Sequence, residues 1–343
     1  MPEIVIVIAD LYLKHDAPLA AAAQRGAFPG IESAARFGER TSLGHGWRAW
    51  LAGSLGRPDL AAAAPARIAA AAAAATGGGI GTPWIATPLE LSVHRSGTHL
   101  EHRGILRLAR AELTALAHAF KDAFGPSGLA LTPLSSGDFL LETPGIAAVP
   151  TLEPARWAGG DVAVALPRGA GAAPLRRFLS EVEMWLHAQE LNDTRRRRGD
   201  PPVTTLWPWG ATGEPAPPER RATHGAPLAF GSEAYLRGLW QLLGSECRGL
   251  PGRFEDVASA ASAAGAVLIV DVGAELERDA ECTLADAMSR LDARFVSPSL
   301  EALRRGEVDG VTLIANDTLV RLRRRSHLRV WRRARAAGLA GFA

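Results

Sequence analysis

The sequence of 343 residues predicts an α/β fold in which helices cover both faces of a mostly parallel sheet. Short, uninterrupted apolar runs at residues 4–8, 266–270 and 311–315 are the first evidence. Such runs are typical of strands that are buried on both faces. Apolar residues recur with the helical period between the first of these runs and the others, most clearly over residues 175–191. This alternation favours a parallel sheet.

Further elements can be placed from local signals. Apolar periodicity predicts helices over residues 32–37 and 110–124. A helix is also expected from Pro58 through the alanine-rich tract to Thr76, where a run of glycines follows. Residues 91–93 and 99–103 predict the strands of a hairpin that turns at Ser96 and Gly97.

Local signals also place helices, a loop and a strand in the second half of the chain. An arginine run at 195–198 and a proline pair follow the helix over 175–191, and residues 203–209 predict another apolar strand. Residues 211–227 are rich in proline and predict a surface loop, and residues 235–243 resume a helix. The stretch 319–343 is rich in arginine and predicts a terminal helix.

Composition argues against several classes of protein. The net charge of +2 gives no general attraction to nucleic acid or to a membrane surface. Cys247 and Cys282 match no metal-ligand or redox spacing, so we expect a reducing, cytoplasmic location. The N-terminal apolar run ends at Asp10 without the features of a signal peptide, and no stretch predicts a membrane span. The arginines of 319–343 spread around several helix faces, which favours contact with solvent or a protein partner over nucleic acid.

The most distinctive segment begins at Leu191 and contains Asn192, Arg195, a proline pair and the run 206–210, Leu-Trp-Pro-Trp-Gly. It resembles a segment of archaeal-type cofactor-independent phosphoglycerate mutases, which belong to the alkaline phosphatase superfamily. It is also similar to the RpfE-type regulatory proteins of bacteria, whose chains have about this length. Fainter matches lie at residues 28–35 and 232–244. The resemblance implies one alkaline-phosphatase-like domain over 1–343, with 61–175 as a candidate inserted subdomain.

The resemblance also shows departures from active enzymes of the superfamily, which need a serine or threonine nucleophile and histidine and aspartate ligands for two divalent ions. Where the mutases place a glycine-serine-aspartate turn, residues 43–47 read Leu-Gly-His-Gly-Trp, although Thr41 and Ser42 are close by. The late aspartate-histidine pair of the mutases is replaced by the run 316–318, Asn-Asp-Thr. Asp10 alone stands where the first-strand metal aspartate is expected.

The same segment holds the candidate ligand site. Asn192, Arg195 and Arg198 form a candidate anion site, because arginine can bind a phosphate or carboxylate through two parallel hydrogen bonds. Trp207 and Trp209 alternate within the predicted strand and share a face that could line the same pocket. The alternatives are structural: a helix end for Asn192 and Arg195, and core packing for the tryptophans. Both alternatives stay open.

A second cluster of polar residues lies around the predicted hairpin, at His94, His99, Glu101 and His102. With a turn at Ser96 and Gly97, His94 and His99 face each other and His102 lies on the opposite face. Zinc would need a further ligand from elsewhere, so solvated histidines are the preferred interpretation.

Together these observations predict a catalytically degenerate, regulatory relative of the mutases that needs no cofactor and binds a phosphorylated or carboxylate metabolite. One alternative is an active, metal-dependent mutase or phosphatase. Manganese or another divalent ion would then be held by Asp10, His45, Asp271 and Asp317. A second alternative is a protein-interaction module that uses the proline-rich loop and the arginine-rich tail.

Overall fold

The computed structural model describes residues 2–9, 11, 26–73, 81–95, 97–213, 218–261, 263–279, 281–315 and 317–326. The chain divides into two compact units. Unit 1 comprises Met1–Ala61, Arg220–Leu236 and Leu243–Ala343, and unit 2 comprises Ala62–Glu219 and Arg237–Leu242. Unit 2 is therefore an insertion within the sequence of unit 1. Unit 2 begins at Ala62 and continues to Glu219, whereas the candidate subdomain of the sequence spans residues 61–175.

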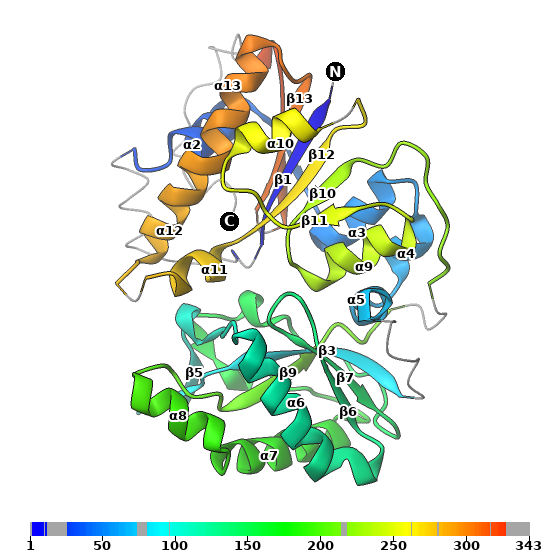
Figure 1. The fold of residues 1–343 in the computed structure, drawn as a ribbon, viewed down its shortest axis with the longest axis vertical. Coiled ribbons are helices and arrows are strands. Elements are labelled where there is room, and N and C mark those ends of the chain that lie inside the picture. The colour runs from blue at the N-terminus through cyan, green and yellow to red at the C-terminus, as the bar shows by residue number, and fades with distance from the viewer. Residues whose placement is uncertain are drawn as a thin grey trace. The chain divides into compact units, whose positions relative to one another are not determined.

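Unit 1 is built on a seven-stranded sheet with the order β11-β10-β12-β1-β13-β14-β2 (Figure 1). The pairs from β11 to β13 are parallel, whereas β14 is antiparallel to both of its neighbours. The strands are β1 (Glu3–Ala9), β2 (Glu39–Ser42), β10 (Leu228–Phe230), β11 (Cys247–Arg248), β12 (Ala266–Asp271), β13 (Gly310–Ala315) and β14 (Thr318–Arg323). The predicted mixed α/β architecture with a large, mostly parallel sheet is confirmed.

The three apolar runs form the middle of this sheet. β1 lies between β12 and β13, and Ile4 is paired with Ala266 on one side and Val311 on the other. Ile6 and Val7, which point to opposite faces, are both fully buried. Burial on both faces explains why these runs contain no alternating polar residues.

The helices associated with unit 1 follow the apolar periodicity of the sequence. They are α2 (Pro29–Phe37), α3 (Gly46–Ser54), α4 (Pro58–Ala62), α10 (Phe254–Ala260), α11 (Val272–Glu277), α12 (Leu284–Leu291) and α13 (Ser297–Arg305). α4 ends at the unit boundary, and α9 (Ala234–Leu242) crosses it. A π-helical segment, Asp292–Val296, joins α12 to α13. In Figure 1, α2, α12 and α13 lie together on one side of the sheet, where their apolar faces complete the main core.

Unit 2 contains an antiparallel sheet with the order β6-β7-β3-β9 and a smaller sheet with the order β4-β5-β8. The strands are β3 (Thr82–Leu89), β4 (Ser92–His94), β5 (Gly97–Leu100), β6 (Ala130–Pro133), β7 (Phe139–Thr143), β8 (Gly160–Asp161) and β9 (Thr205–Trp209). The helices are α5 (Pro65–Ala73), α6 (Arg110–Phe124), α7 (Ala172–His187) and α8 (Glu190–Arg198), with 3₁₀ turns at His102–Gly104, Gly125–Ser127, Pro154–Arg156 and Val162–Val164.

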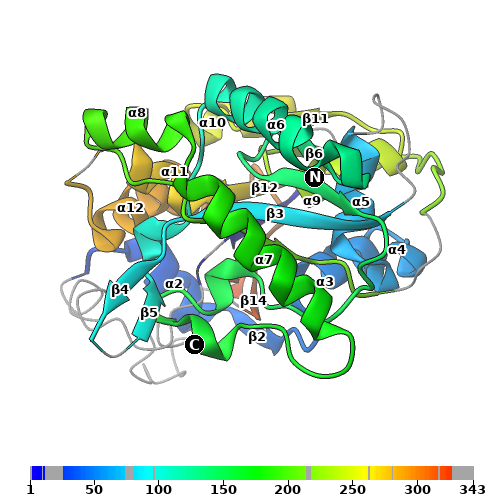
Figure 2. The same cartoon turned by 90° about the horizontal axis from the view of Figure 1, so that it is seen from below.

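A separate core holds unit 2 together. Trp84 and Ala86 alternate to the same face of β3 and pack with apolar residues of α6 and α7, among them Phe120 and Phe178. Figure 2 shows α7 crossing in front of β3. None of the helices in the described part of the chain is long and apolar enough to span a bilayer.

Several predicted elements differ in detail from the structure. The helix expected from Pro58 to Thr76 is two helices, α4 and α5, and Pro65 begins the second because proline cannot donate the hydrogen bond of a continuing helix. Residues after Ala73 in that stretch lie outside the described ranges. The arginine run at 195–198 belongs to α8, a separate helix that ends at Gly199 in the left-handed conformation (φ 80°).

The terminal helix predicted over 319–343 is wrong at its start, because Thr318–Arg323 forms β14. The chain reverses between Ala315 and Thr318, and Leu322 then pairs with Val311 of β13. Leu322 and Val320 are buried, so the apolar residues of this segment pack as part of a buried strand and not of a helix. Residues 327–343, with the other arginines of the tail, lie outside the described ranges.

Candidate functional site

The carboxyl ends of the parallel strands in unit 1 form the first candidate site, because doubly wound sheets bind ligands at this edge. Ala9 ends β1 and pairs with Asp271, which ends β12. Ile8 pairs with Ala315, which ends β13. Asp271 and the β13–β14 turn therefore lie at the same edge. Asp10, a predicted metal ligand, lies outside the described residues.

The other predicted metal ligands occupy a helix cap, a turn and a helix start. The Asp271 carboxylate accepts hydrogen bonds from the backbone N–H groups of Gly273 (2.8 Å) and Ala274 (3.4 Å), which caps α11. Asp317 lies in the turn between β13 and β14, where its carbonyl accepts a hydrogen bond from the N–H of Leu43 (2.7 Å). His45 is exposed and immediately precedes α3. Within the described ranges, no three histidine, cysteine, aspartate or glutamate side chains are grouped so that they could hold a metal.

A charged cluster that no sequence pattern indicated comes from the segments following β2 and β10. Arg48 Nη2 lies 3.1 Å from Glu233 Oε1, and both side chains are largely buried. The Arg48 guanidinium stacks on the ring of Trp47, with 4.5 Å from Cζ to the ring centroid. Glu233 also accepts a hydrogen bond from Leu236 N–H (2.7 Å), which caps α9. Because Arg48 and Glu233 lie 185 residues apart, no local pattern indicates their pairing.

Tyr235 completes this cluster. Its hydroxyl donates a hydrogen bond to the backbone carbonyl of Arg48 (2.9 Å), and its ring packs edge-on against Trp47. Burial raises the pKa of Tyr235 well above its usual range. The hydroxyl is thus kept protonated and links α9 to α3, which is a structural role.

The predicted anion site around Asn192 is engaged in the fold of unit 2. The Asn192 side-chain amide donates hydrogen bonds to the carbonyls of Leu186 and Val203, both at 2.8 Å. Its Oδ1 accepts a hydrogen bond from Val203 N–H, also at 2.8 Å. Asn192 is 2% exposed, so its amide joins the end of α7 to the segment that enters β9.

Arg195 is held in the same region. Its Nε donates to the carbonyl of Pro201 (2.7 Å), and its Nη1 lies 2.8 Å from Glu112 Oε1. Burial raises the pKa of Glu90, and the positive charge of Arg195 offsets part of that increase. Arg198, in contrast, is exposed in the last turn of α8. The structural alternative, a helix end, accounts for the contacts of Asn192 and Arg195.

The two tryptophans of the distinctive segment are core residues. Both are buried, and Trp207 donates a hydrogen bond from Nε1 to the carbonyl of Leu152 (2.9 Å). Trp209 donates from Nε1 to Thr87 Oγ1 (2.9 Å), and Thr87 donates in turn to Asp138 Oδ1 (2.8 Å). These bonds tie β9 to β3 and to the start of β7. The core-packing alternative accounts for both side chains.

The histidine hairpin has a different register from the predicted one. Ser92 pairs with His99, and His94 pairs with Gly97, so the turn lies one residue earlier. Gly97 has φ 137°, and a Cβ there would lie 2.6 Å from Asp161 Oδ2, so this close approach requires glycine. The rings of His94 and His99 still lie near each other, with 5.2 Å between centroids.

Comparison with known proteins gives distant structural neighbours only. No protein-family model matches the chain. No curated protein matches it either. Among solved structures, the chain is similar to the cofactor-independent phosphoglycerate mutase from Thermoplasma acidophilum DSM 1728, with 16% identity, 94% of this chain and 90% of that chain covered, and a TM-score of 0.39.

It is also similar to the PH0037 protein from Pyrococcus horikoshii, with 13% identity, 94% of this chain and 87% of that chain covered, and a TM-score of 0.48. Both alignments span nearly the whole chain at very low identity. They assign no role to any residue of the candidate sites.

Proposed function

We propose that this chain is a non-catalytic, regulatory relative of the cofactor-independent phosphoglycerate mutases, which binds a phosphorylated or carboxylate metabolite. The main support is that acidic residues at the carboxyl ends of the parallel strands have structural roles. Asp271 caps α11 with its carboxylate, and Asp317 lies in a tight turn where the mutases carry an aspartate-histidine pair. No cofactor is needed for a binding function of this kind.

Phosphoryl transfer by a two-metal mechanism needs several carboxylate or imidazole ligands that converge on two nearby ions. At this edge the described segments after β2, β12 and β13 supply His45, Asp271 and Asp317, which form no such group. Arg48 and Glu233, which follow β2 and β10, neutralise each other in an ion pair. This arrangement supports a structural role, and not a catalytic one, for the residues at this edge of the sheet.

One observation favours the alternative of an active, metal-dependent enzyme. Asp271 pairs across the sheet with Ala9, the residue before Asp10 in the sequence. Two of the four candidate ligands, Asp10 and Asp271, therefore stand in the sequence at the ends of two adjacent strands. Under this alternative Asp10 and Asp271, with His45 and Asp317, would hold manganese or a similar ion. The ion would polarise a phosphoryl oxygen.

The experiment measures metal content and activity on the same preparation of the full chain. Metal is quantified by inductively coupled plasma mass spectrometry. Interconversion of 3- and 2-phosphoglycerate and hydrolysis of p-nitrophenyl phosphate are assayed with and without manganese. We expect the wild type to show no turnover above that of the Asp271→Asn variant. Asp256→Asn, which changes an aspartate at an exposed position, is the matched control. Manganese-dependent turnover that falls at least a hundredfold in Asp10→Asn and Asp271→Asn, but not in the control, would overturn the proposal.

A further inference from the structure

Polar side chains gather on one face of the small sheet β4-β5-β8 in unit 2, whose hairpin strands β4 and β5 lie side by side in Figure 2. Residues that pair across antiparallel strands point their side chains to the same face. His99 pairs with Ser92 of β4 and with Asp161 of β8, so these three share a face. His94, two residues after Ser92, lies on it too, opposite Gly97. We name this surface the histidine face.

The glycine at position 97 makes room for a carboxylate in the histidine face. Gly97 has no Cβ, and Oδ2 of Asp161 lies only 2.6 Å from the place that this atom would occupy. The other oxygen, Oδ1, accepts a hydrogen bond from the N–H of Ala163 (2.7 Å), which holds the carboxylate in place. Asp161 therefore supplies an oxygen donor from outside the hairpin, which the histidines alone would lack.

The distances among the other donors are close to those between ligands of one tetrahedral ion. With Zn–N bonds of about 2.0–2.1 Å, two imidazoles on one zinc have ring centroids about 5 Å apart, and neighbouring donor atoms lie about 3.3 Å apart. The rings of His94 and His99 lie 5.2 Å apart and are nearly perpendicular, at 86°. Nε2 of His94 lies 3.6 Å from Oε1 of Glu101. Glu101 follows His99 by two residues in extended backbone (φ −74°, ψ 158°), so it continues the histidine face.

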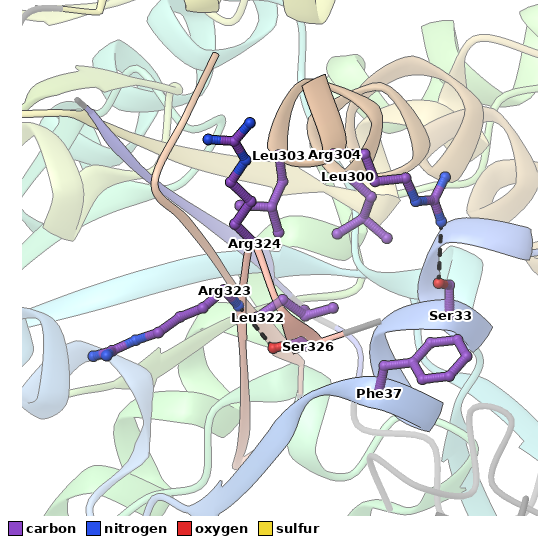
Figure 3. Close-up of a pocket in the computed structure, with 9 residues that line it drawn as sticks. All are labelled: Ser33, Phe37, Leu300, Leu303, Arg304, Leu322, Arg323, Arg324 and Ser326. Atoms are coloured by element: carbon purple, nitrogen blue, oxygen red, sulfur yellow. Dashed lines mark hydrogen bonds between the residues drawn. The ribbon is translucent and has the colours of Figure 1, made fainter. Parts of the chain in front are cut away.

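This gathering of donors distinguishes the histidine face from a cluster of arginines in unit 1. In the hollow between α2, α13 and the end of β14, the guanidinium groups of Arg304, Arg323 and Arg324 point in different directions (Figure 3). These groups do not meet on one ligand. The donors of the histidine face, in contrast, project from the same side of one sheet.

We infer that the histidine face binds one zinc ion, held by the imidazoles of His94 and His99 and by the carboxylates of Glu101 and Asp161. Zinc accepts nitrogen and carboxylate oxygen donors together in tetrahedral sites. As the side chains lie, no three of them in the described ranges are grouped closely enough to hold an ion. Rotamer changes of His94 and Glu101 bring the donors together. These side chains are 50% and 59% exposed, and exposed side chains change rotamer rapidly.

The zinc ion acts as a staple for this small sheet. β4 has three residues, β5 has four and β8 has two, so few backbone hydrogen bonds hold the strands together. Ligands from β4, β5 and β8 on one ion cross-link all three strands. All four ligands belong to unit 2, so this inference does not depend on the function proposed from the sheet edge of unit 1.

The test removes metal from the full chain with EDTA and then follows the binding of Zn²⁺ by isothermal titration calorimetry. We expect one zinc per chain, and His94→Ala and His99→Ala should each weaken binding about tenfold or more, because each removes a ligand. Asp161→Asn should also weaken binding, although its amide oxygen can still accept the hydrogen bond from Ala163 N–H. His118→Ala, at an exposed position of α6 in the same unit, is the matched control and should leave the affinity unchanged.

Hydrogen–deuterium exchange tests the staple. Zinc should slow amide exchange over residues 92–101 in the wild type but not in the double variant His94→Ala/His99→Ala, and circular dichroism checks the fold of each variant. Absence of zinc binding in the wild type overturns the inference. Binding that persists in the double variant also overturns it. Binding that Asp161→Asn leaves unchanged does so too, because β8 would then provide no ligand.

The double variant also distinguishes this zinc from a catalytic ion at the carboxyl edge of unit 1. It should lose its zinc and keep the turnover of the wild type, whatever that turnover is. Loss of turnover together with the zinc would overturn the staple role, because the ion would then take part in catalysis.

Discussion

The Asp292 carboxylate accepts a hydrogen bond from the backbone N–H of Gly30, at 3.0 Å and across 262 residues of sequence. Its other oxygen accepts from Ile31 N–H at 2.7 Å, and Ser297 Oγ donates to Oδ2 at 2.8 Å. Gly30 and Ile31 lie in the first turn of α2, whose own N-cap residue, Phe28, provides no side-chain acceptor. A residue of the π-helical segment therefore caps a helix from the other end of the chain.

Removing this cap should destabilise unit 1. Asp292→Ala leaves the N–H groups of Gly30 and Ile31 buried without acceptors, and we expect a loss of about 2–4 kcal/mol in the free energy of unfolding. Urea unfolding followed by circular dichroism measures the loss. Glu301→Ala, an exposed acid on the adjacent α13, is the control and should change stability by less than about 0.5 kcal/mol. Equal effects of the two substitutions would contradict the capping role.

The same residue should give stability a distinctive pH dependence. Burial raises the pKa of Asp292, although its hydrogen bonds with Gly30, Ser297 and Ile31 partly oppose the increase. Between the unfolded pKa of about 3.9 and the raised folded pKa, the folded chain binds more protons than the unfolded chain. The contribution of Asp292 to stability is therefore largest below the unfolded pKa and falls as the pH rises through the folded pKa.

This dependence can be isolated with Asp292→Asn, which does not titrate. The unfolding free energy of the wild type minus that of Asp292→Asn should decrease as the pH rises from about 4 toward neutrality. Urea unfolding at several pH values gives this difference. An increase with pH would mean that the hydrogen bonds outweigh burial in setting the pKa of Asp292.

A methyl group at Gly30 should also disturb the cap. A Cβ there would lie 2.7 Å from Ser297 N and 2.8 Å from Asp292 Oδ1, which is too close for real atoms. We expect Gly30→Ala to cost about 1–3 kcal/mol. Gly53→Ala in α3 is the matched control, because no atom lies within 4 Å of its Cβ position. It should stabilise the protein by about 0.5–1 kcal/mol, because alanine is favoured over glycine in a helix. Thermal unfolding of both variants tests the contrast.

Asn192 allows a structural role to be separated from ligand binding. Asn192→Asp places a carboxylate against the buried carbonyls of Leu186 and Val203, so it should lower stability at neutral pH by about 3 kcal/mol or more. Arg198→Ala, at an exposed position in the same helix, should be nearly neutral. Chemical unfolding of both variants is the measurement. A stable Asn192→Asp protein that loses affinity for an anionic ligand would restore the binding interpretation.

The parts of the fold that could be predicted are those whose apolar pattern lies within one short segment of the sequence. The helix expected over 110–124 matches α6 because its apolar periodicity lies within the segment. The runs at 4–8, 266–270 and 311–315 were identified as strands because burial on both faces leaves an uninterrupted apolar pattern. The hairpin strands were also identified, but their register was not, because the turn that fixes the register lies one residue earlier than the sequence indicated.

The candidate site was less predictable, because the same residue types serve structure and binding. Arg195 suggested an anion site, but Glu112, which lies 83 residues earlier, is its partner.

Local patterning thus predicted the α/β class, the central strands β1, β12 and β13, and several helices, since backbone propensity and side-chain periodicity act over a few residues. It did not predict strands such as β3, β7 and β14. The long-range pairings, such as Asp292 with Gly30 and Arg48 with Glu233, emerged only from the folded chain. The physical reason is that a charge or hydrogen-bonding group acts on whatever the packing of distant elements places within about 3 Å of it, and that packing is a property of the whole chain.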